Sequence, residues 1–404
     1  MLEQTILSQA LEIQEELRSY RRWLHAHAEV GFDLKQTLSY VKEALEQMGY
    51  MPELCGRCGL TATVGKPGGA VVLLRADMDA LPIQEDTNLP FASSHGTMHA
   101  CGHDMHTAML LGAAKLLKRH EQALSGMVKL MFQPAEELFE GSSDMIQAGV
   151  LENPRPDAAF MIHVTAGSSI PAGTILVNRP GASAPAADYF TITVHGKGCH
   201  GSAPQDGVDA LSVAAHILLA LQQISARELA PSEEAALTIG TMHGGTAGNV
   251  IADSATMEGT IRTYQESTRS FIKNRMEQIV RGIAESFRAS ATLDFGSGCP
   301  ALWNDGKLCE LSTNWLKTLL GPTKALSLEE WGPQTKGGGS EDFAYISQQV
   351  PALMLVLAAG EPEKGYIYPQ HHPKVKFDES VLNTGSAAFA YLALQYLAHH
   401  PNQL

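Results

Sequence analysis

Apolar runs alternate with amphipathic segments along most of the chain. Continuous apolar runs predict buried strands, and apolar residues spaced three or four positions apart predict helices. We expect strands at 60–64, 71–74, 127–132, 158–162 and 353–357. We expect helices at 4–26, 34–48, 105–117 and 379–399. Strands that alternate with helices predict an α/β fold, in which helices cover both faces of a mostly parallel sheet.

A segment of different composition interrupts this pattern. Residues 181–187 are rich in Gly, Ala, Ser and Pro, which is typical of a hinge. The region that follows predicts strands and helices in the order β-α-β-β-α-β, the order of a small ferredoxin-like α+β domain. We therefore expect one large domain from residues 1–185 and 296–404, with a second domain inserted at 186–295.

Size and charge narrow the class of protein. The chain has 404 residues, more than one core usually accommodates, and 44% of them are hydrophobic, as in globular proteins. A net charge of −14 disfavours a nucleic-acid partner, which would need a basic face. No uninterrupted apolar run approaches the ~20 residues that cross a membrane. We expect a small-molecule partner, with neither nucleic acid nor membrane.

Cysteine usage and the N-terminus indicate a cytoplasmic protein. Six cysteines in a chain of this length do not make a disulfide scaffold. Glu3, Glu12 and Glu15 lie where a signal peptide would need an apolar core. Cys55 and Cys58 form a C-x-x-C pair, but no second pair completes a zinc ribbon, so we interpret them as reduced and incidental.

The stretch from His99 to His106 concentrates potential metal ligands. It holds three imidazoles, a thiol and a carboxylate in eight residues. Cys101 and His103 can both reach one ion, because only Gly102 separates them and glycine permits a tight turn. The alternative is a polar turn before a helix, in which His99 and His106 are merely solvated.

Further polar side chains follow predicted strands. Asp77 and Asp79, Glu136 and Glu137, and His163 each come just after an apolar run. Ligands of open α/β sheets bind outside the carboxyl ends of the strands, so we expect these groups at one edge with Cys101. Two adjacent glutamates without a basic neighbour are costly unless something positive lies between their carboxylates. Polar loops alone could also produce this pattern.

Five motifs together resemble the M20 metallopeptidase family. They lie at 75–82, 98–106, 133–137, 244–250 and 339–343. The resemblance runs from about residue 20 to the C-terminus. It is strongest to the amidohydrolase branch, which includes hippurate hydrolase, auxin-conjugate hydrolases and N-acetyldiaminopimelate deacetylase. It implies a zinc-exopeptidase-like catalytic domain and an inserted domain that serves as a lid and forms a homodimer.

The resemblance also implies a site for two divalent metal ions. Cys101 would bridge both ions, Glu137 and His371 would complete one, and His103 and His163 would complete the other. A thiolate bridge suits zinc, with manganese, cobalt and nickel as alternatives. The register of the motif favours His371 over its neighbour as the ligand, and Asp77 is not an obvious ligand in this branch.

Catalytic and substrate-binding roles follow from the same resemblance. Glu136 resembles the general base, and Asp79 the carboxylate that orients a ligand. His200 of the inserted domain would enter the partner subunit's site and stabilise an oxyanion. Asn249 and Arg262 would hold the substrate carboxylate or the oxyanion, since guanidinium binds carboxylates bidentately. The simpler alternatives are a turn residue for His200 and a strand-end salt bridge for Arg262.

Two departures from the family pattern affect the expected substrate. Cys199 stands where the family usually has glycine, and Val164 to Gly167 replace an aromatic residue and a proline. The interpretation is a cytoplasmic, homodimeric, two-metal amidohydrolase of N-acyl amino acids or small conjugates. A dipeptidase or carboxypeptidase with the same machinery is the alternative. A non-catalytic metal- or ligand-binding protein would have lost Glu136 or a ligand, and all are present.

Overall fold

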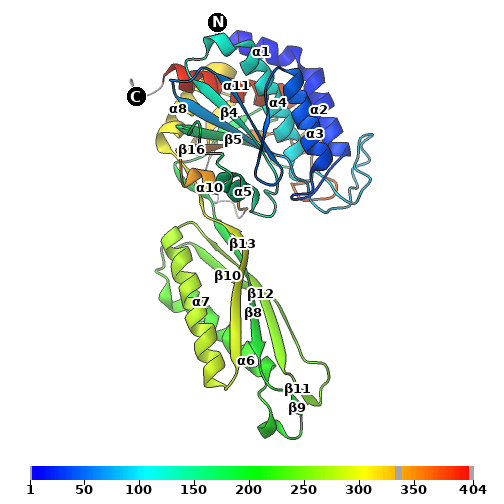
Figure 1. Ribbon diagram of the computed structural model, residues 1–404, viewed down its shortest axis with the longest axis vertical. Helices are drawn as coiled ribbons and strands as arrows, with labels where there is room; N and C mark the ends of the chain where they lie inside the picture. Colours follow the sequence, from blue (N-terminus) through cyan, green and yellow to red (C-terminus); the bar gives the residue numbers. More distant parts are fainter. Residues whose placement is uncertain (1, 333–338, 400–404) are drawn as a thin grey trace. The chain divides into compact units, whose positions relative to one another are not determined.

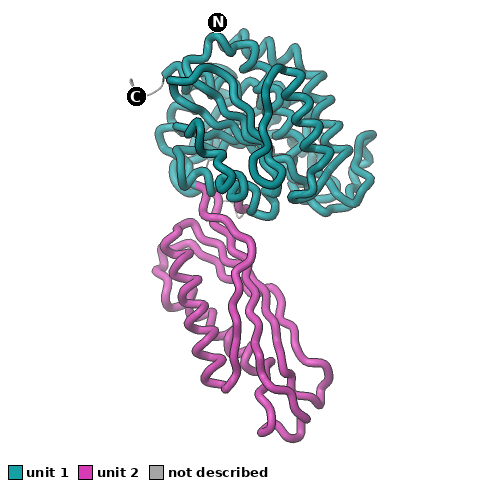
Figure 2. Tube along the Cα trace, viewed as in Figure 1, with its two compact units in different colours: residues 1–183, 303–336, 341–404 teal, residues 184–302, 337–340 magenta. Residues whose placement is uncertain are grey.

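The computed structural model describes residues 2–332 and 339–399. It divides into two compact units (Figure 2): unit 1 is formed by residues 1–183, 303–336 and 341–404, and unit 2 by residues 184–302 and 337–340. Unit 2 extends to residue 302, beyond the boundary at 295 that the sequence suggested. The last strand of unit 2 continues through a register shift between Phe295 and Gly298. Residues 296–298 are glycine and serine, so the sequence shows no hydrophobic pattern in this part of the strand.

Unit 1 is built on an eight-stranded sheet in the order β1-β2-β4-β3-β5-β16-β6-β15 (Figure 1). The strands are β1 (Glu53–Cys55), β2 (Gly59–Gly65), β3 (Val71–Asp77), β4 (Met127–Gln133), β5 (Ala158–Thr165), β6 (Ile175–Val177), β15 (Ala325–Ser327) and β16 (Ala352–Ala358). The four central strands, β4, β3, β5 and β16, run parallel to one another. Their carboxyl ends therefore meet at one edge, where α/β folds bind their ligands.

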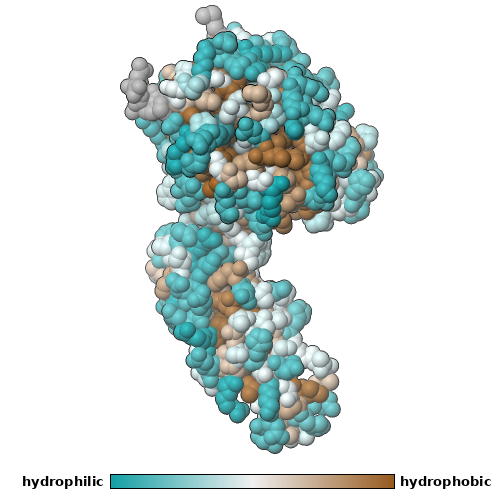
Figure 3. Space-filling view, viewed as in Figure 1, coloured by the Kyte–Doolittle hydropathy of each residue, from teal (hydrophilic) through white to brown (hydrophobic). Residues whose placement is uncertain are grey.

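Helices cover this sheet and complete its core. They are α1 (Leu2–Glu12), α2 (Gln14–Ala26), α3 (Lys35–Gln47), α4 (His103–Arg119), α5 (Gly141–Gln147), α8 (Gly306–Leu320), α9 (Leu328–Trp331), α10 (Ala344–Ser347) and α11 (Leu382–Ala398). Almost every side chain of α4 and α11 is buried, whereas α1 and α2 expose hydrophilic surface (Figure 3). No helix in the described ranges is long and apolar enough to cross a membrane.

The sequence prediction for unit 1 omitted the strands β1, β6 and β15 and the helices α5, α8, α9 and α10, and two of the elements that it did predict differ in detail. The helix expected at 4–26 is two helices, α1 and α2, separated at Ile13. Strand β5 continues to Thr165, so His163 lies within the strand and not after it. The reason is its neighbour: β16 pairs in parallel with β5 as far as Thr165 and Ala358, and this pairing extends the strand.

Unit 2 is a four-stranded antiparallel sheet in the order β10-β12-β8-β13, with two helices. Its elements are β8 (Ala186–His195), β9 (Cys199–His200), α6 (Ala210–Gln223), β10 (Ala235–Gly244), β11 (Val250–Ile251), β12 (Ser254–Thr263), α7 (Glu266–Ser286) and β13 (Ser290–Cys299). The short strands β7 (Gly181–Ala184) and β14 (Leu302–Asn304) pair where the chain passes between the units. Alternate residues of β8, such as Phe190 and Ile192, share one core with α6 and α7. Both helices therefore pack on the same face of the sheet.

Candidate active site

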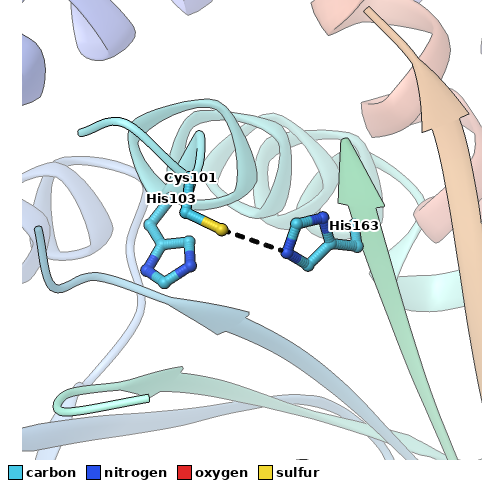
Figure 4. Close-up of side chains that lie close together, drawn as sticks. All are labelled: Cys101, His103 and His163. Atoms are coloured by element: carbon cyan, nitrogen blue, oxygen red, sulfur yellow. Dashed lines mark hydrogen bonds between the residues drawn. The ribbon is translucent and has the colours of Figure 1, made fainter. Parts of the chain in front are cut away.

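The turn before α4 places a thiol and an imidazole opposite a histidine of β5. Figure 4 shows Cys101 and His103 at the start of α4, with His163 approaching from the strand. Cys101 Sγ lies 3.5 Å from His163 Nε2. Gly102 between them has a φ of +90°, and a Cβ there would lie only 2.5 Å from a methyl group of Val164. Both the backbone conformation and the space require glycine at this position.

Two clusters of potential ligands share the Cys101 thiol. The first is Cys101, His103 and His163, and the second is Cys101, Glu137 and His371. Within each cluster the ligand atoms all lie within 4.8 Å of one another. In the second cluster, His371 Nε2 lies 3.4 Å from a carboxylate oxygen of Glu137. A thiolate can bridge two cations, so this arrangement offers places for two ions.

The chemistry of these side chains fits divalent cations. His103 Nε2 and Glu137 Oε1 are buried and have no hydrogen-bond partner in the described part of the chain. In both histidines of the first cluster, the other ring nitrogen is already hydrogen-bonded. Nδ1 of His103 donates to the backbone oxygen of Asp79, and Nδ1 of His163 donates to the backbone oxygen of Val164. Such bonds present Nε2 to a metal with its lone pair free. Buried polar atoms without partners are costly, and a cation would satisfy both of them.

Charge interactions favour a thiolate at Cys101. Burial would raise the pKa of this thiol, but His163, His103 and His371 outweigh burial and lower it to about 6. Burial would lower the pKa of His163, yet the thiolate raises it to about 9. Hydrogen bonds to Cys101 and Glu137 raise the pKa of His371 to about 10. The ligand atoms therefore favour a thiolate beside imidazolium rings, whose protons a cation would displace.

Glu136 lies beside the clusters with a strongly perturbed carboxyl group. Its side chain is buried, and burial together with Glu341, Glu137 and Asp342 raises its pKa well above the usual value. A carboxylate in this setting accepts a proton readily. Elevated proton affinity next to a ligand cluster is the property that a general base needs.

Asp79 holds the turn that carries both glutamates. Its two carboxylate oxygens accept hydrogen bonds from the backbone N–H groups of Glu136 at 3.0 Å and Glu137 at 3.2 Å. The preceding Ala135 has a φ of +51°, and His371 has a φ of +64°. Positive φ is uncommon for residues other than glycine, and such strained backbone concentrates at functional sites.

Sequence reasoning assigned no role to Arg75, which is fully buried behind the site. Its guanidinium contacts Asp77 at 2.6 Å, Glu341 at 2.8 Å and Asp342 at 3.0 Å. It also donates to the Gln133 side chain at 2.9 Å. The available signal was a charged residue inside an otherwise apolar strand, because a buried charge must have partners.

His106 is also structural, and it is not solvated. Its Nδ1 bonds to Asp77 Oδ1 at 2.6 Å, and its Nε2 accepts from the backbone N–H of Val164 at 2.8 Å. Asp77, His103 and His106 form a further cluster of possible ligands. However, both nitrogens of His106 and both carboxylate oxygens of Asp77 already have partners. Asp77 and His106 instead join β3 and β5 to the start of α4.

Unit 2 brings together two of the three site residues expected there. His200 pairs with Val250, the residue after Asn249, and the backbone N–H of Gly201 donates to the oxygen of Asn249 at 2.8 Å. Arg262 lies near the C-terminal end of β12, whereas Asn249 precedes the N-terminal end of that strand. Its guanidinium donates to Ser340 Oγ at 2.6 Å and lies over the Tyr189 ring.

His372 and the two C-x-x-C cysteines make structural contacts in unit 1. His372, beside His371, stacks on Tyr368 at 4.3 Å between ring centroids. Cys55 and Cys58 are free thiols that contact the backbone oxygens of Met145 and Phe32. These contacts are those of packed structural cysteines.

Comparison with known proteins decides the family. Residues 73–395 match the peptidase family M20/M25/M40. The chain belongs to this family. The M20 chain is 38% identical over 394 residues to thermostable carboxypeptidase 1 of Saccharolobus solfataricus, covering 95% of this chain and 96% of the other. It is 35% identical over 388 residues to N-acetylcysteine deacetylase of Bacillus subtilis, covering 94% and 96%.

Two further comparisons bear on the activity. IAA-amino acid hydrolase ILR1-like 4 of Arabidopsis thaliana is 36% identical over 385 residues, covering 93% of this chain and 84% of the other. The structure of Bacillus subtilis YXEP, described as a dinuclear metal binding peptidase from the M20 family, aligns with a TM-score of 0.79 at 33% identity, covering 96% and 99%. The M20 fold, these hydrolase relatives and the ligand clusters make the chain a metal-dependent amidohydrolase, and they confirm the resemblance to the amidohydrolase branch.

Proposed function

We propose that this M20 enzyme hydrolyses the amide bond of N-acyl amino acids or small conjugates at a two-metal centre. The observation that carries the proposal is the pair of ligand clusters that share Cys101. One ion would be held by Cys101, His103 and His163, and the other by Cys101, Glu137 and His371. Zinc is the expected metal, because thiolate and imidazole ligands favour it.

Bound divalent cations would supply water activation and polarisation of the amide carbonyl. Glu136 takes a proton from the attacking water as the water oxygen bonds to the amide carbon. The oxygen of the former carbonyl gains negative charge, and the Nε2–H of His200 donates to it. The C–N bond then breaks while Glu136 returns its proton to the leaving nitrogen. Asp79 touches no reacting atom in this scheme and holds the Glu136 turn in place.

The carboxylates around Glu136 already have partners within the protein. This favours an acylated substrate over one with a free α-amine. A free amine would need an acidic partner in the pocket. Glu341 is bound to Arg75 and to the backbone N–H of Phe343. Asp342 is bound to Arg75, Gln133 and the backbone N–H of Ser142. With both carboxylates engaged, an N-acyl group suits the site better.

A hydrolysis screen tests this proposal. The protein would be assayed against N-acetyl amino acids, indole-acetyl amino acids, N-blocked dipeptides and free dipeptides, with bound metal measured on the same sample. We expect two metal equivalents and the highest kcat/KM on N-acyl amino acids. The similarity to thermostable carboxypeptidase 1 makes peptide hydrolysis the second candidate. Preference for dipeptides with a free amine would contradict the proposed substrate class.

We also propose that the enzyme is a homodimer in which His200 serves the partner's site. The chain enters and leaves unit 2 at the end of the sheet where Ala187 pairs with Arg262 and Cys299. The His200 turn follows the opposite end, where His195 pairs with Ser254. From Ser254 to Arg262, β12 advances by eight residue steps, which span roughly 26 Å at about 3.3 Å per residue.

An edge strand of unit 2 offers a surface for the dimer. Among the described strands β10 pairs only with β12, so one long edge of this ten-residue strand is open. Exposed edges of this length are normally covered. On α6, Leu219 is 68% exposed, and Figure 3 shows hydrophobic residues exposed among hydrophilic ones on unit 2. A two-fold axis would let β10 and α6 of two copies meet at a self-complementary interface.

Mixing two inactive variants tests the shared site. Glu136→Gln and His200→Ala subunits would be exchanged, and exchange verified by mass spectrometry of differently labelled chains. If His200 acts across the interface, each mixed dimer has one intact site. An equal mixture then recovers about a quarter of the wild-type activity, because about half of the dimers are mixed. Verified exchange with no recovery would place His200 in its own subunit's site or outside catalysis.

We further propose a cytoplasmic location, since Cys55, Cys58 and Cys101 are free thiols. Cell fractionation with activity measured in each fraction tests this location.

A further inference from the structure

Two groups of Ser202 contact one ring nitrogen of His200. The backbone N–H of Ser202 lies 3.1 Å from His200 Nδ1, and Ser202 Oγ lies 2.7 Å from the same atom. Within the described residues, Nε2 of this ring has no hydrogen-bond partner, and the side chain is exposed. The two nitrogens of the ring therefore have different environments.

The backbone donor determines the tautomer. A backbone N–H can only donate, so His200 Nδ1 must carry its lone pair and not a proton. The Ser202 hydroxyl can either donate or accept, and beside an unprotonated Nδ1 it donates. The proton of the neutral ring is then on Nε2, the nitrogen that Ser202 does not contact. A ring protonated on Nδ1 would lose the backbone hydrogen bond.

The turn that carries His200 is itself held in place. The backbone N–H of Ala203 donates to the His200 oxygen at 2.8 Å, which closes a tight turn. A Cβ at Gly201 would lie 2.9 Å from the Asn249 oxygen, so this residue packs directly on the facing strand. His200 pairs with Val250 in the β9–β11 ribbon. The direction of Nε2–H is set by this backbone and by Ser202 together.

We propose that Ser202 is a positioning residue that fixes His200 as the Nε2–H tautomer, ready to donate to the oxyanion. This inference rests on the proposed role of His200. An oxyanion needs a hydrogen-bond donor, and the other tautomer would present a lone pair to it. Ser202 therefore acts on the reaction only through the ring of His200.

Nuclear magnetic resonance of the full-length, ¹⁵N-histidine-labelled enzyme tests the tautomer directly. The His200 signals are assigned by their loss in His200→Ala. We expect Nδ1 to resonate as an unprotonated nitrogen and Nε2 as a protonated one. In Ser202→Ala the backbone bond remains, so we expect a partial shift toward a mixture of tautomers. The loss of one neutral hydrogen bond should lower kcat about 2- to 10-fold, with little change in KM.

Two further variants separate positioning from general damage. Ser202→Thr keeps the hydroxyl and should restore both the nitrogen shifts and kcat. Ser286→Ala removes a hydroxyl of α7 that, among the described residues, bonds to the Gly282 oxygen of its own helix, and should leave both readouts unchanged. A protonated Nδ1 in the wild type, or wild-type shifts and kcat in Ser202→Ala, would overturn the inference. Full kcat in His200→Ala would instead overturn the proposed role of His200, and with it the catalytic purpose of Ser202.

Discussion

The Asp79 carboxylate connects Glu136 and Glu137 to the sheet, so its replacement by asparagine is informative. Asp79 is 1% exposed and follows β3. Its oxygens accept the backbone N–H groups of Glu136 and Glu137, while its backbone oxygen accepts from His103. Asp79→Asn keeps the shape and the backbone contact. It converts one acceptor oxygen into an amide nitrogen, which cannot accept.

The magnitude follows from these contacts. Hydrogen bonds to a charged group contribute about 1.5–3 kcal/mol each, so losing one and weakening the other costs roughly 2–3 kcal/mol of stability. The two N–H groups cannot both be satisfied, and the turn must shift. A displacement of about 1 Å at a catalytic group can cost on the order of 10²-fold in rate. We therefore expect Asp79→Asn to lower kcat about 100-fold.

The assay combines steady-state kinetics, metal analysis and thermal unfolding. Asp305→Asn is the matched control, because its carboxylate accepts the backbone N–H of Leu308 at the start of α8, at 2.9 Å. Asparagine is as good an N-cap as aspartate, so this control should retain activity. A folded, metal-loaded Asp79→Asn enzyme with wild-type kcat would refute the positioning argument. A variant that loses metal in proportion to activity would show that Asp79 acts through the ligands instead.

Three further outcomes are expected. Glu136→Gln should keep metal and fold but lose about 10²- to 10⁴-fold in kcat, because an amide cannot take the water proton; near wild-type turnover would remove Glu136 as the base. Cys101→Ala should lower the occupancy of both ions, measured by elemental analysis, and two retained equivalents would contradict the bridging thiolate. With pKa values of about 9 for His163 and about 10 for His371, both rings are protonated at pH 7 and must release protons when a cation binds. Metal affinity of the chelator-treated protein should therefore rise from pH 7 to pH 9, and calorimetry in buffers of different ionisation enthalpy should show proton release; an affinity independent of pH would exclude this coupling.

The order of the long strands β2, β3, β4, β5 and β16 and of the helices α2, α3, α4 and α11 could be predicted from the sequence, because it depends on local patterns. The run Val71–Asp77 is buried over its whole length, and a strand buried on both faces leaves a continuous apolar signal. The ligand candidates were recognisable for a similar reason. Cys101 and His103 are close in the sequence, and Glu137 follows a strand whose carboxyl end must lie at the binding edge of the sheet.

The partners of the buried charges were decided only by the tertiary structure. Arg75 meets Glu341 and Asp342, which are more than 260 positions away in the sequence. No local pattern indicates which carboxylates a buried guanidinium will contact. The tertiary structure also decided the position of His163. This residue lies inside β5 because β16 extends that strand by pairing with it. Local periodicity determines which segments become strands and helices, but the neutralisation of buried charge depends on distances that exist only after the strands have come together.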